Sequence, residues 1–413
     1  MPRILIIAAI AASYYVFAIL LNSVGTVILQ SITSFEVSKP DASTLEGFKD
    51  LSIALVSFLV ASFIPRVGYK VAMLVGLAMV GVLCALLPGI AEFWMIKVLF
   101  AGVGTAFALV KVSVYAIIGQ LSPDTRSHSS LMNTIEGIFM LGVLSGYWVF
   151  SAFIDEVNAA SLSWLNVYYL LAAIVAVTFL LVCLAPIDKP EKSNDTGSGA
   201  EFLAMLKLTY QPLVLIFILS IFLYVLIEQG IGSWLPTFNR EVLGLPVNVS
   251  IQITSIFAVS LAVGRLLAGV ILARVNWFPF LTVCLIMMAA IMVLSLPLAE
   301  DGAGAGATSW LQAPVAAFLI PLIGLTMAPI YPVINSVMLS ALPKVQHAPM
   351  TGLIVVFSAL GGTTGSIITG YVFEAMGGQR AFYLSLIPIG LIMLTLYLFK
   401  RVSGQLTGTE ATA

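Results

Sequence analysis

Long apolar runs repeat along this chain and alternate with short polar loops. A helix needs about 20 mostly apolar residues to cross a bilayer, and the runs reach or exceed that length. They are continuous, without the short alternating segments typical of a transmembrane barrel. The pattern predicts twelve spanning helices, over residues 4–33, 43–64, 70–90, 93–119, 129–154, 163–187, 210–238, 249–272, 276–298, 312–341, 348–375 and 379–400.

One polar stretch interrupts this rhythm after the sixth run. Residues 188–208 are rich in charged residues, Ser and Gly, a composition typical of a linker. The linker divides the chain into an N-terminal six-helix bundle, residues 1–187, and a C-terminal six-helix bundle, residues 209–401. Residues 402–413 are polar, and we expect them to be a disordered tail.

Composition supports a membrane protein. Only 9% of the 413 residues are charged and 60% are hydrophobic, whereas soluble proteins are about 25% charged. The net charge of −1 gives no basic field that would attract nucleic acid. The three cysteines lie singly inside apolar runs, so we expect no disulfide framework, metal site or cofactor.

Lysines and arginines predict the orientation. With both termini on one side, eleven basic residues fall on that side and three on the other. Basic residues concentrate on the cytoplasmic side, so we expect both termini in the cytoplasm and the chain in a plasma membrane, the inner membrane of a bacterium. The larger group is Arg3, Arg66, Lys70, Arg126, Lys189, Lys192, Lys207, Arg274, Lys344, Lys400 and Arg401.

Four ionisable residues lie deep inside predicted spans: Lys111, Glu136, Glu228 and Arg265. A charge at the bilayer centre costs about 2.5–3.5 kcal/mol on insertion scales, so each needs a reason. Lys111 and Glu136 are each about ten residues from the loop that joins their spans, and equal lengths of helix give equal depth. We therefore expect a Lys111–Glu136 ion pair or a shared polar cavity. Such a pair either takes part in substrate binding and coupling or has the structural role of holding two helices together.

Further polar residues on the same spans complete a candidate site. Glu228 and Gln229 precede a Gly-Ile-Gly segment that weakens the helix, and Trp234 follows. A carboxylate, an amide and an indole suit a polyol, although Trp234 could instead be an interfacial residue. We expect Glu136 and Glu228 to couple protons. The expected substrate-binding residues are Asn22, Lys111, Tyr115, Asn133, Glu136, Glu228, Gln229, Trp234, Tyr331 and Asn335.

Two matching loops indicate an internal repeat. Arg66 follows span two in Ile-Pro-Arg-Val-Gly-Tyr, and Arg274 follows span eight, 208 residues later, in Leu-Ala-Arg-Val-Asn-Trp. With twelve spans and a central linker, the chain resembles the Major Facilitator Superfamily, although the Asp of that family's loop signature is missing. The resemblance implies an all-α fold of two pseudo-symmetric six-helix bundles with a midplane site between them. We expect Arg66, Arg265 and Arg274 to act in gating.

A narrower resemblance rests on scattered residues of both halves. Tyr224-Val225, Ser233-Trp234-Leu235, Gly264-Arg265, Tyr331-Pro332 and the pair Asn133 and Gly142 resemble the fucose–galactose–glucose proton symporters. That resemblance implies a proton-driven sugar carrier. The acidic residue that those symporters carry in span one is absent, because Ser23 follows Asn22 here, and Phe107 stands near the place of their span-four Glu.

Glycine pairs mark two spans. Gly142 and Gly146 in span five, and Gly361 and Gly365 in span eleven, have the four-residue spacing that lets helices approach closely. We expect these pairs to form sliding contacts between the two halves. We expect a monomer.

The function expected from these patterns is secondary active transport of a small polar solute, a sugar moved with H⁺, by alternating access. Lys111 and Arg265 leave open a carrier of an anionic sugar acid or organic carboxylate, and a multidrug exporter is a further alternative. The nucleotide-binding pattern GxxxxGK[ST] is absent, and so is a clustered catalytic set, so we expect no enzyme. The alternative of another class is a non-transporting membrane sensor or an intramembrane enzyme.

Overall fold

The computed structural model describes residues 2–122, 124–187, 207–343 and 346–410. Every regular element in these ranges is a helix, which confirms the predicted all-α class. The chain divides into two compact units, Met1–Thr196 (unit 1) and Gly197–Ala413 (unit 2). The division falls inside the expected linker, of which only Lys207 and Leu208 belong to the described residues.

Eleven of the described helices are long and apolar enough to cross a membrane. The remaining predicted span, residues 43–64, lies inside one continuous 29-residue helix, α3. Lipid offers no partner to backbone N–H and C=O groups, so each span must satisfy them internally, as a helix does. The chain is an integral membrane protein with the predicted polytopic architecture.

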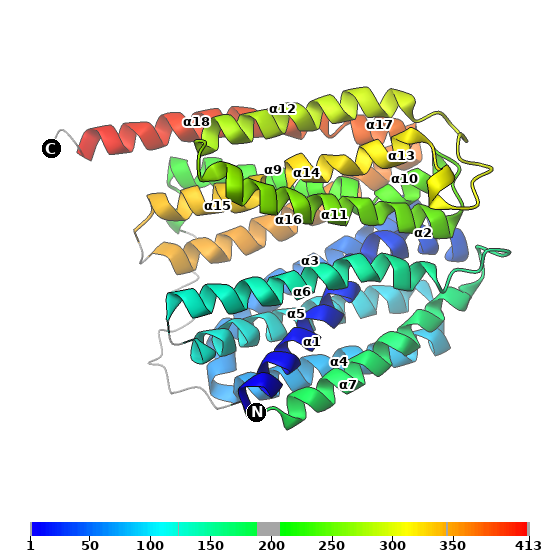
Figure 1. The fold of residues 1–413 in the computed structure, drawn as a ribbon, viewed down its shortest axis with the longest axis horizontal. Coiled ribbons are helices and arrows are strands. Elements are labelled where there is room, and N and C mark those ends of the chain that lie inside the picture. Colours follow the sequence, from blue (N-terminus) through cyan, green and yellow to red (C-terminus); the bar gives the residue numbers. More distant parts are fainter. Residues whose placement is uncertain (1, 123, 188–206, 344–345, 411–413) are drawn as a thin grey trace. The chain divides into compact units, whose positions relative to one another are not determined.

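Unit 1 is a bundle of long helices (Figure 1). In it α1 packs on α6, α3 on α5, and α4 on both α5 and α7. The Ser38 hydroxyl caps the start of α3 by accepting from the backbone N–H of Asp41 at 3.2 Å. The elements are α1 (Pro2–Asn22), α2 (Val24–Phe35), α3 (Lys39–Val67), α4 (Tyr69–Ile90), α5 (Phe93–Leu121), α6 (Thr125–Ser151), η1 (Leu162–Asn166) and α7 (Val167–Leu184).

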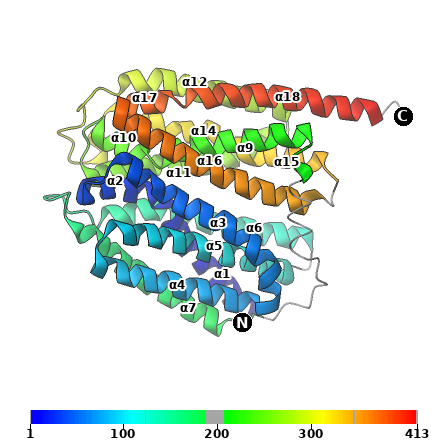
Figure 2. The ribbon, with the colours of Figure 1, turned by 180° about the vertical axis from the view of Figure 1, so that it is seen from behind.

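Unit 2 repeats this plan with shorter pieces. Its α9 packs along α16 and α18, α11 along α14, and α12 along α14 and α18 (Figure 2). The elements are α9 (Pro212–Gly232), α10 (Leu235–Glu241), α11 (Val247–Leu272), α12 (Trp277–Ser295), η2 (Leu296–Leu298), η3 (Trp310–Gln312), α13 (Val315–Leu319), η4 (Ile320–Leu322), α14 (Ile323–Met327), α15 (Ile330–Ala341), α16 (His347–Met376), α17 (Gly378–Tyr383) and α18 (Leu386–Glu410).

The first span of each unit is interrupted, where the sequence predicted single helices over 4–33 and 210–238. In unit 1 the interruption is at Ser23, whose hydroxyl donates to the Leu20 carbonyl at 2.8 Å and so competes with the backbone pattern. In unit 2 it is at Ser233 and Trp234, just before Pro236, which has no N–H to continue a helix. The two interruptions occupy corresponding places in the repeat.

The tenth span, predicted as residues 312–341, is divided into four short pieces, α13, η4, α14 and α15. Pro321 lies in the 3₁₀ turn η4, and Pro329 lies at the start of α15. Both prolines remove a backbone donor, which explains why no single helix forms. The last break places Tyr331 and Asn335 on a separate helix.

The glycine pairs pack within the units, which corrects the expectation of contacts between halves. A Cβ at Gly142 would lie 2.6 Å from the carbonyl oxygen of Tyr15, so α6 rests directly on the α1 backbone. Cβ atoms at Gly361 and Gly365 would collide with the backbone carbonyls of Phe222 and Leu226 on α9. The pairs therefore fix corresponding helix crossings, α1–α6 and α9–α16.

Within the expected tail, residues 402–413, helix α18 continues through Glu410, and residues 411–413 lie outside the described residues. No proline follows Pro388 in the sequence, and extending an existing helix is far easier than starting one.

Candidate functional site

A polar cluster in unit 1 joins α5 and α6. The Tyr115 hydroxyl donates to Glu136 Oε1 at 3.2 Å. The Lys111 ammonium lies 5.7 Å from the ring centroids of both Tyr115 and Phe107. In the described part of the chain, Lys111 and Glu136 form no direct ion pair, and the Tyr115 side chain contacts both. The short α5–α6 connection brings these side chains to the same depth.

Aromatic rings surround this cluster. Tyr14 lies 5.9 Å from Phe139 and 6.1 Å from Phe107, between ring centroids, and Phe17 lies 5.8 Å from Phe107. Such rings attract a cation through their faces, by about 0.5–2 kcal/mol. Of these rings Phe107, together with Tyr115, lies within reach of the Lys111 ammonium and stabilises it. The sequence interpretation missed Tyr14, although it adjoins Tyr15 on the first span.

The α1–α6 crossing aligns a second polar pair. Tyr15 and Ser145 share a hydrogen bond of 2.9 Å, one turn beyond Gly142. Asn22 donates to the Ala18 carbonyl of its own helix at 2.9 Å, and Asn133 lies exposed on α6.

Unit 2 holds a corresponding cluster. The Tyr224 hydroxyl donates to Glu228 Oε1 at 3.2 Å, and the Tyr224 and Tyr331 rings lie 5.7 Å apart. Tyr331 shares a 3.3 Å hydrogen bond with Ser358. Helices α9, α15 and α16 thus meet around one polar group.

Asn335 adds an unused acceptor to this region. It lies one turn after Tyr331 on α15, and its Oδ1 atom is buried. No hydrogen-bond donor among the described residues reaches that oxygen. A buried polar atom without a protein partner is unfavourable unless water or a ligand supplies one. This oxygen is suited to accept from a solute hydroxyl.

Trp234 does not offer a ring face to a solute, which corrects the sequence prediction. Its side chain is fully buried, and Nε1 donates to the Ser366 carbonyl at 3.1 Å. The ring lies 5.6 Å from Phe373 of α16. The break between α9 and α10 turns the indole into the bundle. Gln229 is partly exposed, and its Oε1 accepts from Ser233 at 3.3 Å.

Two of the expected gating residues, Arg66 and Arg274, lie near the ends of helices. The Arg66 side chain lies outside the described part of the structure, whereas Arg274 is exposed between α11 and α12. Lys70, close to Arg66 in the sequence, binds the end of a helix. It donates to the carbonyls of Cys183 and Ala185 at 2.8 Å each, at the C-terminal end of α7, where a cation is favourable.

The sequence interpretation also missed three charged residues of α3: Glu46, Lys49 and Asp50. All three are buried, and Lys49 pairs with both carboxylates. Their spacing of three and four residues on one helix face is visible in the sequence. They were overlooked because they lie near the predicted start of the second span.

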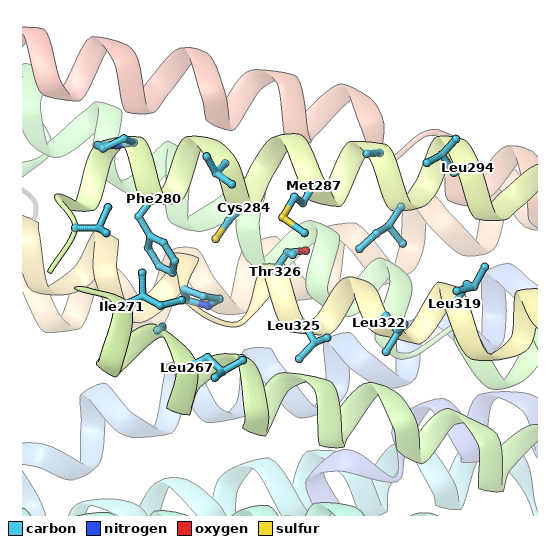
Figure 3. A pocket seen from close by; sticks show the side chains of 18 of the residues that line it. Leu267, Ile271, Phe280, Cys284, Met287, Leu294, Leu319, Leu322, Leu325 and Thr326 are labelled. Atoms are coloured by element: carbon cyan, nitrogen blue, oxygen red, sulfur yellow. The ribbon is translucent and has the colours of Figure 1, made fainter. Parts of the chain in front are cut away.

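A large apolar pocket in unit 2 is distinct from these polar groups. It has a volume of about 840 Å³ and lies between α11, α12 and α14 (Figure 3). Leu267, Phe280, Met287 and Leu322 line it, and Thr326 is one of its few polar residues. The pocket lacks the donors and acceptors that a polar solute requires.

Comparison with known proteins identifies the class. A family model for the Major Facilitator Superfamily matches residues 5–320. The chain therefore belongs to this superfamily and is a transporter rather than an enzyme. Two glucose/galactose transporters of Brucella abortus, from biovar 1 (strain 9-941) and from strain 2308, are each 24% identical over 343 residues, which cover 81% of this chain and 79% of the relative.

Solved structures share the fold. A bacterial homologue of the human lysosomal transporter Spinster matches with a TM-score of 0.74 at 13% identity, over 96% of both chains. The nucleoside transporter NupG gives 0.71 at 15%, over 96% of this chain and 98% of that one. The E. coli fucose:proton symporter FucP gives 0.61 at 16%, over 97% and 99%.

Proposed function

We propose that this protein is a secondary active transporter that moves a sugar together with protons by alternating access. One observation carries the proposal: each unit holds an intramembrane glutamate whose carboxylate accepts from a tyrosine hydroxyl at 3.2 Å. Carboxylates in a membrane span are costly and mark substrate or proton pathways. The similarity to glucose/galactose transporters supports a hexose as the substrate.

The chemistry of the two clusters suits a polyol. Glu136, Glu228 and Asn335 supply oxygens that accept from sugar hydroxyls, and Gln229 and Asn133 supply amide groups. The Tyr115 ring is 37% exposed and replaces the expected Trp234 face as a surface for sugar C–H groups. The Lys111 ammonium of unit 1 supplies N–H donors to the sugar hydroxyl oxygens. The expected contact of Asn22 with the solute stays part of the proposal.

Proton coupling follows from the same carboxylates. Protonation of Glu136 or Glu228 removes a negative charge inside a span and makes each group a donor as well as an acceptor. A solute that binds the protonated form better than the ionised form couples its own movement to that of the proton. Arg66, Arg265 and Arg274 act in gating in this proposal.

We further propose that the protein works as a monomer in a plasma membrane, the inner membrane of a bacterium, with both termini in the cytoplasm. The support is the excess of basic residues on the side that holds the termini. Its partners are the solute, H⁺ and the lipid bilayer.

Reconstituted protein tests the function. Purified protein in liposomes, given labelled D-glucose or D-galactose and an imposed pH gradient, accumulates sugar above equilibrium. The Glu136→Gln, Glu228→Gln double variant loses this accumulation, whereas Glu92→Gln, at an exposed loop carboxylate, keeps it. A double variant that keeps full pH dependence and full accumulation contradicts the proposal.

An anionic solute is the second candidate, because Lys111 and Arg265 are cations inside spans. A sugar acid would pair its carboxylate with one of them. Competition in the same liposomes separates the two. Neutral galactose inhibits uptake more strongly than galacturonate if the sugar proposal holds, and the reverse order establishes the acid.

A further inference from the structure

Three charged residues of α3 form a buried group that the proposed function does not use. Glu46, Lys49 and Asp50 lie on one face of the helix, since residues three and four apart are neighbours there. Lys49 Nζ pairs with Glu46 Oε1 and lies 3.4 Å from Asp50 Oδ1. The residues are 0%, 6% and 9% exposed, respectively.

This group lies within α3, inside the predicted second span, residues 43–64. The close crossing of α3 and α5 is at Gly104, where a Cβ would collide with the carbonyl oxygen of Lys49. Gly104 is well inside α5 (Phe93–Leu121), and Lys49 is well inside α3 (Lys39–Val67). Buried ions in a span are costly and are retained for a function more often than for stability.

Two carboxylates that share one ammonium can accept a proton without leaving a charge unpaired. In a simple pair, protonating the acid would strand a buried ammonium. Here a proton from water can bind an Asp50 carboxylate oxygen, the Lys49–Asp50 attraction ends, and Lys49 stays paired with Glu46. Asp50 is the favoured acceptor because its contact with Lys49 is the longer one and its side chain is 12% exposed, against 0% for Glu46.

The helices packed against α3 add few other charges. Helix α5 contributes Lys97, whose ammonium lies 5.9 Å from the ring of Phe48, and Lys111 of the polar cluster. Helix α2 contains no ionisable residue, and on α4 the cation Lys70 is engaged with the end of α7. Tyr69 and Cys84 are the other titratable groups of α4.

We propose that Glu46, Lys49 and Asp50 form a second proton-binding site, separate from Glu136 and Glu228, with Asp50 as the group that takes and releases the proton. The site rests on the proposed function, because it serves proton-driven transport. When Asp50 is protonated, Lys49 keeps Glu46 as its carboxylate partner and has a neutral Asp50 beside it, next to the α3–α5 crossing. The site thereby links proton occupancy to the packing of these two helices.

Liposomes test this site through two modes of D-galactose uptake. Counterflow exchanges sugar for sugar without net proton movement, whereas accumulation against a gradient requires proton release. Asp50→Asn keeps counterflow and loses pH-driven accumulation, and the matched control Glu92→Gln keeps both. An Asp50→Asn variant that accumulates galactose as wild type does overturns the proposal and leaves the proposed function intact.

A second measurement needs no substrate. Infrared difference spectra of purified wild type between about pH 8 and pH 6 detect protonated buried carboxyls, since exposed ones titrate near pH 4. The Glu136→Gln, Glu228→Gln protein keeps a carboxyl band, and Asp50→Asn lacks that band. A spectrum with no band left after the double substitution overturns the site. If wild type shows the Asp50 carboxyl band but takes up no sugar, the proposed function is refuted and the proton-binding site remains.

Discussion

Replacing Gly142 with alanine tests how the α1–α6 crossing positions the unit 1 site. The new Cβ would lie 2.6 Å from the Tyr15 carbonyl oxygen and 2.7 Å from Ala18 Cβ, whereas ordinary contacts begin near 3.4 Å. The neighbours are backbone and a methyl group, so neither can rotate away. The helices must separate by about 0.8 Å, and overpacking of this kind costs about 1–3 kcal/mol.

Thermal unfolding of the purified protein measures this cost. Gly142→Ala is expected to lower the free energy of unfolding by about 2 kcal/mol, which changes the folded-to-unfolded ratio by about 30-fold. The separation also lengthens the 2.9 Å Tyr15–Ser145 hydrogen bond, so uptake falls as well. Gly137 is the matched control on the same helix, because a Cβ there meets nothing within 4 Å. Equal stability of Gly142→Ala and Gly137→Ala would refute the reasoning.

Three further predictions concern single features. Tyr115→Phe removes the hydroxyl that donates to Glu136, and a hydrogen bond to a charged group is worth about 1.5–3 kcal/mol, so uptake efficiency falls by about tenfold or more. The control Tyr371→Phe, at an exposed position, leaves uptake unchanged, and equal losses in both variants would count against the site. Trp234→Phe removes the hydrogen bond from the indole to the Ser366 carbonyl, so it lowers the melting temperature but not the affinity for sugar. A large rise in KM would show instead that Trp234 contacts the sugar. A C-terminal green fluorescent protein fusion fluoresces and an alkaline phosphatase fusion stays inactive if the C-terminus is cytoplasmic, and the opposite result reverses the orientation.

The repeating apolar runs were sufficient to predict the architecture. Hydrocarbon thickness fixes the length of a span, so the places of the spans follow from the pattern of apolar runs. Interruptions were harder to predict, because Ser23 and Trp234 lie inside stretches, 4–33 and 210–238, that are long enough to form one continuous helix each. Backbone competition from a serine, or a proline two residues later, decides them locally.

The polar residues show a similar limit. Equal distances from a loop correctly brought Lys111 and Glu136 into one cluster, but their partners depend on three-dimensional packing that the sequence does not display. Tyr115 contacts both, and the Phe107 and Tyr115 rings lie beside the Lys111 ammonium in place of the expected direct ion pair. For Trp234, one helix break decides whether an indole faces a cavity or the core.

Proton movement driven by sugar tests the central proposal most directly. D-galactose added to lightly buffered liposomes that contain the purified protein, with a pH electrode in the medium, should produce alkalinisation outside as protons enter with the sugar. The Glu136→Gln, Glu228→Gln protein should produce none. Galactose entry without any pH change, at the same rate in both proteins, would contradict proton-coupled transport through these carboxylates.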